Sequence, residues 1–237
     1  MPVERLDKFL VSQNIGSRKE AARLVRGGAV TVNGQTAKDP AQKLDPALDR
    51  VAVDGREVAY RKHLYIMMNK PTGVLSATED KHTPTVLDLL PPDLQRRRLF
   101  PAGRLDKDTT GLLLITDDGD FAHRMLVPKS HVYKRYQAVT ERPVTQEDVE
   151  AFAAGIRRGE LQFAPARLWS GEEGGRPVAL VEIREGKFHQ VKRMFEATGN
   201  RVLELRRLAV GGLVLDPELG PGECRLLSEE EAASVFS

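Results

Sequence analysis

The stretch that organises this sequence is residues 103–115, GRLDKDTTG followed directly by LLLI. The first nine residues contain two carboxylates, Asp106 and Asp108, two adjacent threonines and a glycine at each end. The apolar run 112–115 predicts a short buried β-strand. Functional side chains often lie on a polar loop that a rigid element positions. We therefore expect the candidate site at residues 103–111.

Three interpretations of this loop follow from its residues alone. The first is a calcium-binding loop of twelve residues, in which Asp106, Asp108, Thr110, Gly111 and Asp117 would take positions 1, 3, 5, 6 and 12. It lacks the usual Glu at its last position, and no helix is expected to enter it. The second is the D-x-D-x-T nucleophile loop of an aspartyl-phosphate phosphatase, but no apolar strand precedes the first Asp. In the third, the Asp and Thr side chains only form local turns.

The segments around the loop predict a mixture of strands and helices. Apolar runs and capping signals predict the strands 64–68 and 178–183, the helices 85–90, 145–156 and 191–197, and a last helix that begins after Ser228. We expect the glycine-rich stretch 170–177 to be a loop. The elements do not alternate with regular βαβ spacing. The predicted fold class is therefore α+β with a mostly antiparallel sheet.

The first 60 residues predict a small separate unit. Leu6, Phe9 and Leu10 have the spacing of one helix face. A capping box, Ser17 to Glu20, begins a second helix. Asn33-Gly34 between two short apolar runs is a strong hairpin signal. We expect a helical and hairpin domain at residues 1–60 and a larger domain at residues 61–237.

The N-terminal unit is locally basic. Residues 1–62 contain 12 Lys and Arg against 8 Asp and Glu, although the whole chain has a net charge of only +2. The second predicted helix presents four basic side chains outward: Arg18, Lys19, Arg23 and Arg26. Such a face is commonly only a solvated surface, but it also suits a polyanionic partner.

Composition excludes several classes of protein. The 237 residues include a single cysteine, Cys224, so neither an intrachain disulfide nor a multi-cysteine zinc site can form. The charged start does not resemble a signal peptide, and no apolar run is long enough to span a membrane. We expect a cytoplasmic protein without a metal site.

Two resemblances extend this interpretation. The stretch RLDKFLVSQNIGSRKEAARLVRGGAVTVNG, residues 5–34, resembles the RNA-binding module named after ribosomal protein S4. In that family the second helix and the following hairpin turn contact RNA. The resemblance implies that Arg18, Lys19, Arg23 and Arg26 bind RNA.

The remainder resembles pseudouridine synthases of the RsuA/RluB family. The matching stretches are AGRLDKDTTGLLLITDDGDFAHR at 102–124, NKPTG at 69–73, KRYQA at 134–138 and EGKFHQVKRMFEATGNRVLELRRLAVGGLVLD at 185–216. Within the family, the lysine at position 192 resembles the sequence pattern of the branch that acts on small-subunit ribosomal RNA. The large-subunit branch is the alternative, as is a non-catalytic RNA-binding protein of ribosome assembly.

The resemblance implies an isomerase that needs no cofactor. The glycosidic bond of a uridine breaks, and the uracil is rejoined to the ribose through carbon 5. By resemblance Asp106 is the catalytic carboxylate, Tyr136 packs on the target base and Lys192 is the basic partner. Arg104 is implied to contact RNA by displacing the target base, and Lys70 is implied to be structural or to contact the backbone.

The expected partner is ribosomal RNA or an assembling ribosomal subunit. We expect a monomer, because no apolar stripe is left uncovered by the predicted elements.

Overall fold

The computed structural model describes residues 3–92, 94 and 98–237. The chain divides into two compact units, residues 1–63 with 90–98 and residues 64–89 with 99–237. Among the described residues, no helix is long and apolar enough to cross a membrane.

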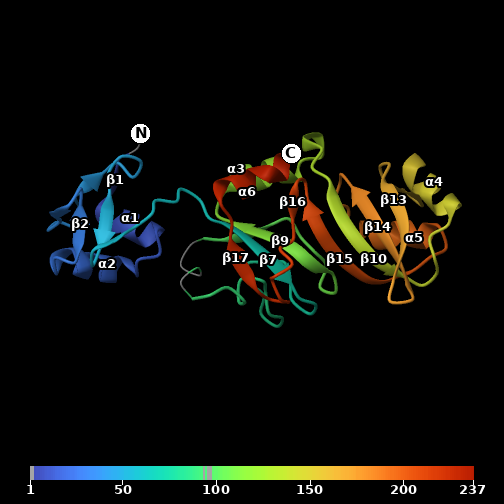
Figure 1. Ribbon diagram of the computed structural model, residues 1–237, viewed down its shortest axis with the longest axis horizontal. Coiled ribbons are helices and arrows are strands. Elements are labelled where there is room, and N and C mark those ends of the chain that lie inside the picture. The colour runs from blue at the N-terminus through green and yellow to red at the C-terminus, as the bar shows by residue number, and fades with distance from the viewer. Residues whose placement is uncertain (1–2, 93, 95–97) are drawn as a thin grey trace. The chain divides into compact units, whose positions relative to one another are not determined.

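The first unit combines two helices with short strands (Figure 1). Its elements are, in chain order, β1 (Glu4–Arg5), α1 (Leu6–Ser12), α2 (Arg18–Arg26), β2 (Val30–Val32), β3 (Gln35–Thr36), β4 (Lys43–Leu44), β5 (Val51–Val53) and β6 (Arg56–Glu57). Four strands form a sheet in the order β3-β2-β5-β6, and β1 pairs with β4.

Local signals in the sequence account for this unit. The backbone N–H of Ser17 donates to the Glu20 carboxylate at 2.6 Å, and the Glu20 N–H donates to the Ser17 hydroxyl at 3.4 Å. The predicted capping box therefore begins α2. Asn33 and Gly34 both have positive φ, 52° and 79°, as the tight turn between β2 and β3 requires. The predicted apolar face of α1 is buried in the core: Leu6, Phe9 and Leu10.

The second unit is built on one large sheet. Its strands are β7 (Tyr65–Lys70), β8 (Phe100–Ala102), β9 (Thr110–Thr116), β10 (Lys134–Thr140), β11 (Arg157–Arg158), β12 (Leu161–Gln162), β13 (Arg167–Glu173), β14 (Arg176–Ile183), β15 (Val202–Val210), β16 (Leu213–Val214) and β17 (Cys224–Leu226). Its helices are α3 (Gly119–Leu126), α4 (Gln146–Ala154), α5 (Gln190–Ala197) and α6 (Glu229–Ala233), with single 3₁₀ turns at Pro128–Ser130 and Ser234–Phe236.

The sheet has the order β13-β14-β10-β15-β9-β7-β17, with β16 paired to β15 and β8 to β9. Its named strand pairs are antiparallel except β15 with β9. Near one half of the sheet α3 and α6 lie together, and near the other lie α4 and α5 (Figure 1). The Phe152 and Phe195 rings, 4.9 Å apart, join α4 to α5, and the Phe121 ring of α3 lies 5.3 Å from Phe236 in the 3₁₀ turn that follows α6. The prediction of a mostly antiparallel α+β fold is confirmed.

Two predictions about local structure are wrong. Residues 85–90 form a turn instead of a helix: Thr85 pairs with Leu75 in an isolated bridge and the Val86 N–H donates to the Leu75 carbonyl, so a contact outside the segment holds its backbone. The glycine-rich stretch is not a loop, because β13 and β14 continue through it with Glu173 opposite Arg176. The glycines between them, 174 and 175, have positive φ and form the two-residue hairpin turn.

The parallel contact between β9 and β15 requires a glycine at position 111. Gly111 has φ +98°, and a Cβ built there would lie 2.3 Å from the carbonyl oxygen of Arg207. No side chain fits, so the glycine that ends the polar loop also permits the two central strands to pair.

We expect Gly111→Ala to destabilise the protein by more than about 3 kcal/mol, because it combines backbone strain with a backbone clash. Urea unfolding measures this loss. Gly73→Ala is the matched control, since Gly73 also has positive φ, +83°, but nothing lies within 4 Å of its Cβ position. That change should cost only about 1–2 kcal/mol. Equal losses for the two variants would contradict the proposed role of the close approach.

Candidate active site

The loop between β8 and β9, residues 103–109, is held by a buried lysine. The Lys70 ammonium donates hydrogen bonds to the carbonyl oxygens of Pro71, Lys107 and Thr109 at 3.0, 3.3 and 3.0 Å. Burial lowers the pKa of Lys70 to about 8, and two nearby carboxylates oppose that shift. The expectation that Lys70 contacts the backbone is confirmed.

A second anchor fixes the loop on the other side of Asp106. The Ser76 hydroxyl donates to the Leu105 carbonyl at 2.9 Å and accepts from the Leu105 N–H at 3.1 Å. The N–H of Thr109 donates to the Asp106 carbonyl at 3.1 Å and closes a turn. The backbone of Asp106 is thus held from both sides, while its side chain keeps 28% of its surface exposed.

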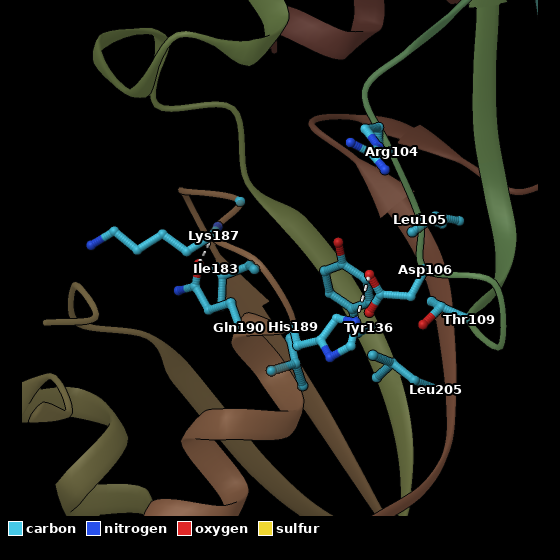
Figure 2. A pocket seen from close by; sticks show the side chains of 12 residues that line it. Arg104, Leu105, Asp106, Thr109, Tyr136, Ile183, Lys187, His189, Gln190 and Leu205 are labelled. Carbon is cyan, nitrogen blue, oxygen red and sulfur yellow. Dashed lines mark hydrogen bonds and ion pairs between the residues drawn. The ribbon is translucent and has the colours of Figure 1, made fainter. Parts of the chain in front are cut away.

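Asp106 faces a pocket that distant segments build together. The lining residues are Arg104, Leu105, Asp106, Thr109, Tyr136, Ile183, Gly186, Lys187, His189, Gln190, Val191 and Leu205. Figure 2 shows the Asp106 carboxylate beside the Tyr136 ring and directed at the His189 imidazole. The predicted residues Asp106, Tyr136 and Arg104 therefore share one pocket.

Tyr136 belongs to the buried face of β10. Its neighbours in the sheet are Val181 of β14 and Arg207 of β15. The tyrosine is only 8% exposed, and Ile183 and Leu205 supply further apolar pocket wall. An aromatic ring next to a half-buried carboxylate suits a flat, partly apolar ligand with one polar edge.

Arg135, the next residue along β10, is on the opposite face. It donates to the Glu182 carboxylate at 2.8 and 2.6 Å. Arg135 therefore forms a salt bridge that faces away from Tyr136.

Lys192, on α5, links the two carboxylates of the loop. Its ammonium donates to Asp108 at 2.6 Å and lies 3.8 Å from the Asp106 carboxylate. The hydrogen bond from Lys192 holds the pKa of Asp108 below its usual range. The expected basic partner of Asp106 thus makes its direct hydrogen bond to Asp108.

His189 is a neighbour of Asp106 that sequence reasoning missed. Its Nε2 lies 3.5 Å from Asp106 Oδ1. The residue stands at the N-terminal cap of α5 with φ 53°, a left-handed conformation. The signal was its position three residues before Lys192, because residues at that spacing lie on neighbouring parts of a helix surface.

Two polar groups at the pocket have no partner within the described residues. The Arg104 side chain is exposed and forms no ion pair in that part of the chain. The Thr109 hydroxyl is buried and makes no hydrogen bond there. The Arg104 guanidinium remains able to contact a ligand.

Two further cations are buried near Tyr136. Lys134 lies on the same face of β10 and is 7% exposed, and Arg207 is 5% exposed. Arg207 donates to the carbonyl of Leu112 at 2.8 Å. Burial lowers the pKa of Lys134 to about 8, and the nearby charge of Arg207 adds to the shift. Two cationic side chains are thus buried beside Tyr136 in the sheet, outside the lining of the pocket.

The basic residues expected to bind RNA lie together on α2 of the first unit. All four are exposed: Arg18, Lys19, Arg23 and Arg26. A surface hollow is lined by Lys19, Glu20, Arg23, Arg26 and Gly27. A concentration of guanidinium and ammonium groups of this kind suits a phosphate backbone.

The calcium interpretation does not fit the geometry. Thr110 and Gly111 lie in the extended strand β9, and the Asp117 carboxylate accepts a hydrogen bond from the N–H of Leu64. Within residues 3–92, 94 and 98–237, no three His, Cys, Asp or Glu side chains are grouped to hold a metal ion.

Comparison with known proteins agrees with the fold. The profile of the RNA pseudouridylate synthase family matches residues 64–197, and that of the S4 domain matches residues 4–49. The chain is 48% identical to an uncharacterized RNA pseudouridine synthase, YtzG, of Bacillus subtilis, over 96% of both chains. It is 46% identical to ribosomal small subunit pseudouridine synthase A of Escherichia coli, over 98% of this chain and 99% of the relative.

A solved structure agrees as well. A crystal structure of a pseudouridylate synthase covers 98% of this chain with 36% identity and a TM-score of 0.66. The chain belongs to the RNA pseudouridylate synthase family and is an isomerase. The phosphatase interpretation of the Asp-Lys-Asp-Thr string is therefore wrong.

Proposed function

We propose that this enzyme converts a specific uridine of small-subunit ribosomal RNA to pseudouridine, with Asp106 as the reacting carboxylate. The observation that carries the proposal is the doubly anchored Asp106, which faces Tyr136 in a pocket with basic groups on its rim. Identity of 46% along nearly the whole length of the small-subunit enzyme of Escherichia coli supports the choice of RNA.

The reaction rearranges bonds within one nucleotide. The bond between C1′ and N1 breaks, a bond between C1′ and C5 forms, the proton on C5 leaves and N1 gains a proton. Asp106 acts on the ribose, either by attack on C1′ or by removal of a ribose proton. Both roles need a fixed, ionised carboxylate, and the Lys192 ammonium lies 3.8 Å from it.

Tyr136 is proposed to pack on the uracil while it is detached and rotated. Its ring stands beside Asp106, so a base that stacks on it keeps its sugar near the carboxylate. Lys192 is proposed to hold Asp106 and Asp108 in place through its contacts with both.

Arg104 is proposed to take the place of the target base. A paired uridine must leave its helix to reach Asp106, and the vacated space or the flanking phosphate needs a partner. Arg104 is exposed at the rim and forms no ion pair in the described part of the chain, so its guanidinium is available.

Residues 1–60 are proposed to form an RNA-docking domain, supported by the match of residues 4–49 to the S4 domain. The catalytic domain would then comprise residues 61–237. We further propose that the enzyme acts as a monomer in the cytoplasm, on ribosomal RNA or an assembling small subunit.

The reaction can be followed by the release of tritium from carbon 5 of labelled uridine. We expect the wild-type enzyme to release tritium from small-subunit ribosomal RNA, either as naked transcript or in partly assembled particles. Asp106→Asn should release none, because an amide can neither attack C1′ nor accept a proton. The variant should bind the same RNA with similar affinity, which serves as the control for folding.

Other outcomes would contradict parts of the proposal. Release only from large-subunit RNA would keep the chemistry and overturn the substrate. Tight binding without release from any ribosomal RNA would favour a non-catalytic role in ribosome assembly. Release by Asp106→Asn at the wild-type rate would remove Asp106 from the reaction.

The docking role of α2 predicts a change in salt dependence. Arg23→Ala with Arg26→Ala should weaken RNA binding and lower the slope of log affinity against log salt by about 0.7–0.9 for each lost phosphate contact. The matched control is Arg56→Ala, an exposed arginine on β6 of the same unit, which should leave the slope unchanged. An unchanged slope in the double variant would contradict docking through α2.

A further inference from the structure

Phe188 is the most exposed aromatic residue in the described part of the chain. It keeps 67% of its surface exposed, against 45% for Trp169 and 40% for Tyr60. It lies directly before His189, in the segment that leads from β14 to α5. A large apolar ring beside an active site needs an explanation, because burying it would be favourable.

The neighbours of Phe188 hold its ring in a layered arrangement. The His189 ring stacks on it with centroids 3.8 Å apart and an angle of 21° between the planes. The guanidinium carbon of Arg193 lies over the Phe188 ring at 5.0 Å from its centroid. Arg193 forms no ion pair within the described residues, so its charge is not already neutralised by a carboxylate.

The stacked rings of Phe188 and His189 reach the carboxylate of Asp106 through His189. His189 contacts Phe188 on one side and lies 3.5 Å from Asp106 on the other. A ligand group that rests on Phe188 is therefore separated from Asp106 by one imidazole ring. In an RNA substrate, that separation suits the nucleotide next to the one whose ribose meets Asp106.

Aromatic rings and guanidinium planes are the groups on which unpaired RNA bases stack. A protein partner would be expected to cover a wider apolar surface than a single ring flanked by basic groups. The Arg193 guanidinium over the Phe188 ring favours a polyanion, whereas the charge of Lys187 is paired with Glu185.

We propose that Phe188 and Arg193 form a stacking site for the nucleobase that flanks the target uridine. The base packs on the Phe188 ring in place of the Arg193 guanidinium, which turns to contact the adjoining phosphate. The site holds the flanking nucleotide out of its helix while the target uridine enters the pocket. This inference rests on the proposed function only in taking RNA as the substrate.

The test combines enzyme variants with RNA that lacks one base. The RNA is a fragment of small-subunit ribosomal RNA around the uridine that the wild-type enzyme isomerises. It is used intact and with an abasic nucleotide on the 5′ or the 3′ side of that uridine. Phe188→Leu keeps an apolar side chain without a ring, and Phe188→Trp keeps a ring. Trp169→Leu, on β13, is the control for loss of an exposed aromatic elsewhere.

We expect Phe188→Leu to weaken binding of intact RNA by about 5- to 100-fold, with the single-turnover rate at saturating RNA unchanged. Phe188→Trp and Trp169→Leu should bind like the wild type. With one of the two abasic RNAs, Phe188→Leu should cause no further loss, because the contacting base is already absent.

Additive losses with both abasic RNAs, or unchanged binding by Phe188→Leu, would overturn the stacking site and leave the proposed function intact. Failure of the wild-type enzyme to isomerise any ribosomal RNA would instead overturn the proposed function. A lowered rate at saturation with normal binding would assign Phe188 a structural role.

Discussion

The ammonium group of Lys70 fixes the loop on which the active site depends. It lies at the end of β7, directly opposite Gly111 of β9, and reaches three backbone carbonyls. The loop has no strand pairing at Asp106, so these hydrogen bonds and the Ser76 anchor replace a ladder. The burial of Lys70 costs free energy that the charge-assisted hydrogen bonds offset. The central strands of the sheet and the position of the reacting carboxylate are consequently linked through one side chain.

Lys192 and His189 lie at different distances from the Asp106 carboxylate. Lys192 hydrogen-bonds Asp108 and stays farther from Asp106, so Asp106 keeps its carboxylate oxygens available on the pocket side. His189 approaches the same carboxylate from the beginning of α5. The Lys192 ammonium thus places positive charge 3.8 Å from Asp106 while its hydrogen bond goes to Asp108. A polyanionic substrate then meets the exposed Arg104 at the rim, and the exposed Asp108 carboxylate is paired with Lys192.

Local signals in the sequence predicted much of the fold but little of the active site. The run 112–115 predicted β9, and capping residues predicted where several helices begin, because these signals act over a few residues. The hairpin at Gly174-Gly175 was missed, since glycine marks both loops and tight turns. The convergence of Asp106, Tyr136 and Lys192 could be expected only from resemblance, because long-range packing brings their segments together. His189 was missed for the same reason, since its importance lies in a contact across the fold.

The most direct test of this account is the single-turnover rate of uridine isomerisation by Lys70→Met at saturating RNA. Folding of the variant is verified by urea unfolding, and its RNA affinity is measured alongside. If Lys70 holds the loop, the rate should fall by about 100-fold or more while RNA affinity changes little, because a small displacement of Asp106 is enough to misalign it. A folded Lys70→Met enzyme that reacts at the wild-type rate would show that the position of Asp106 does not depend on these hydrogen bonds.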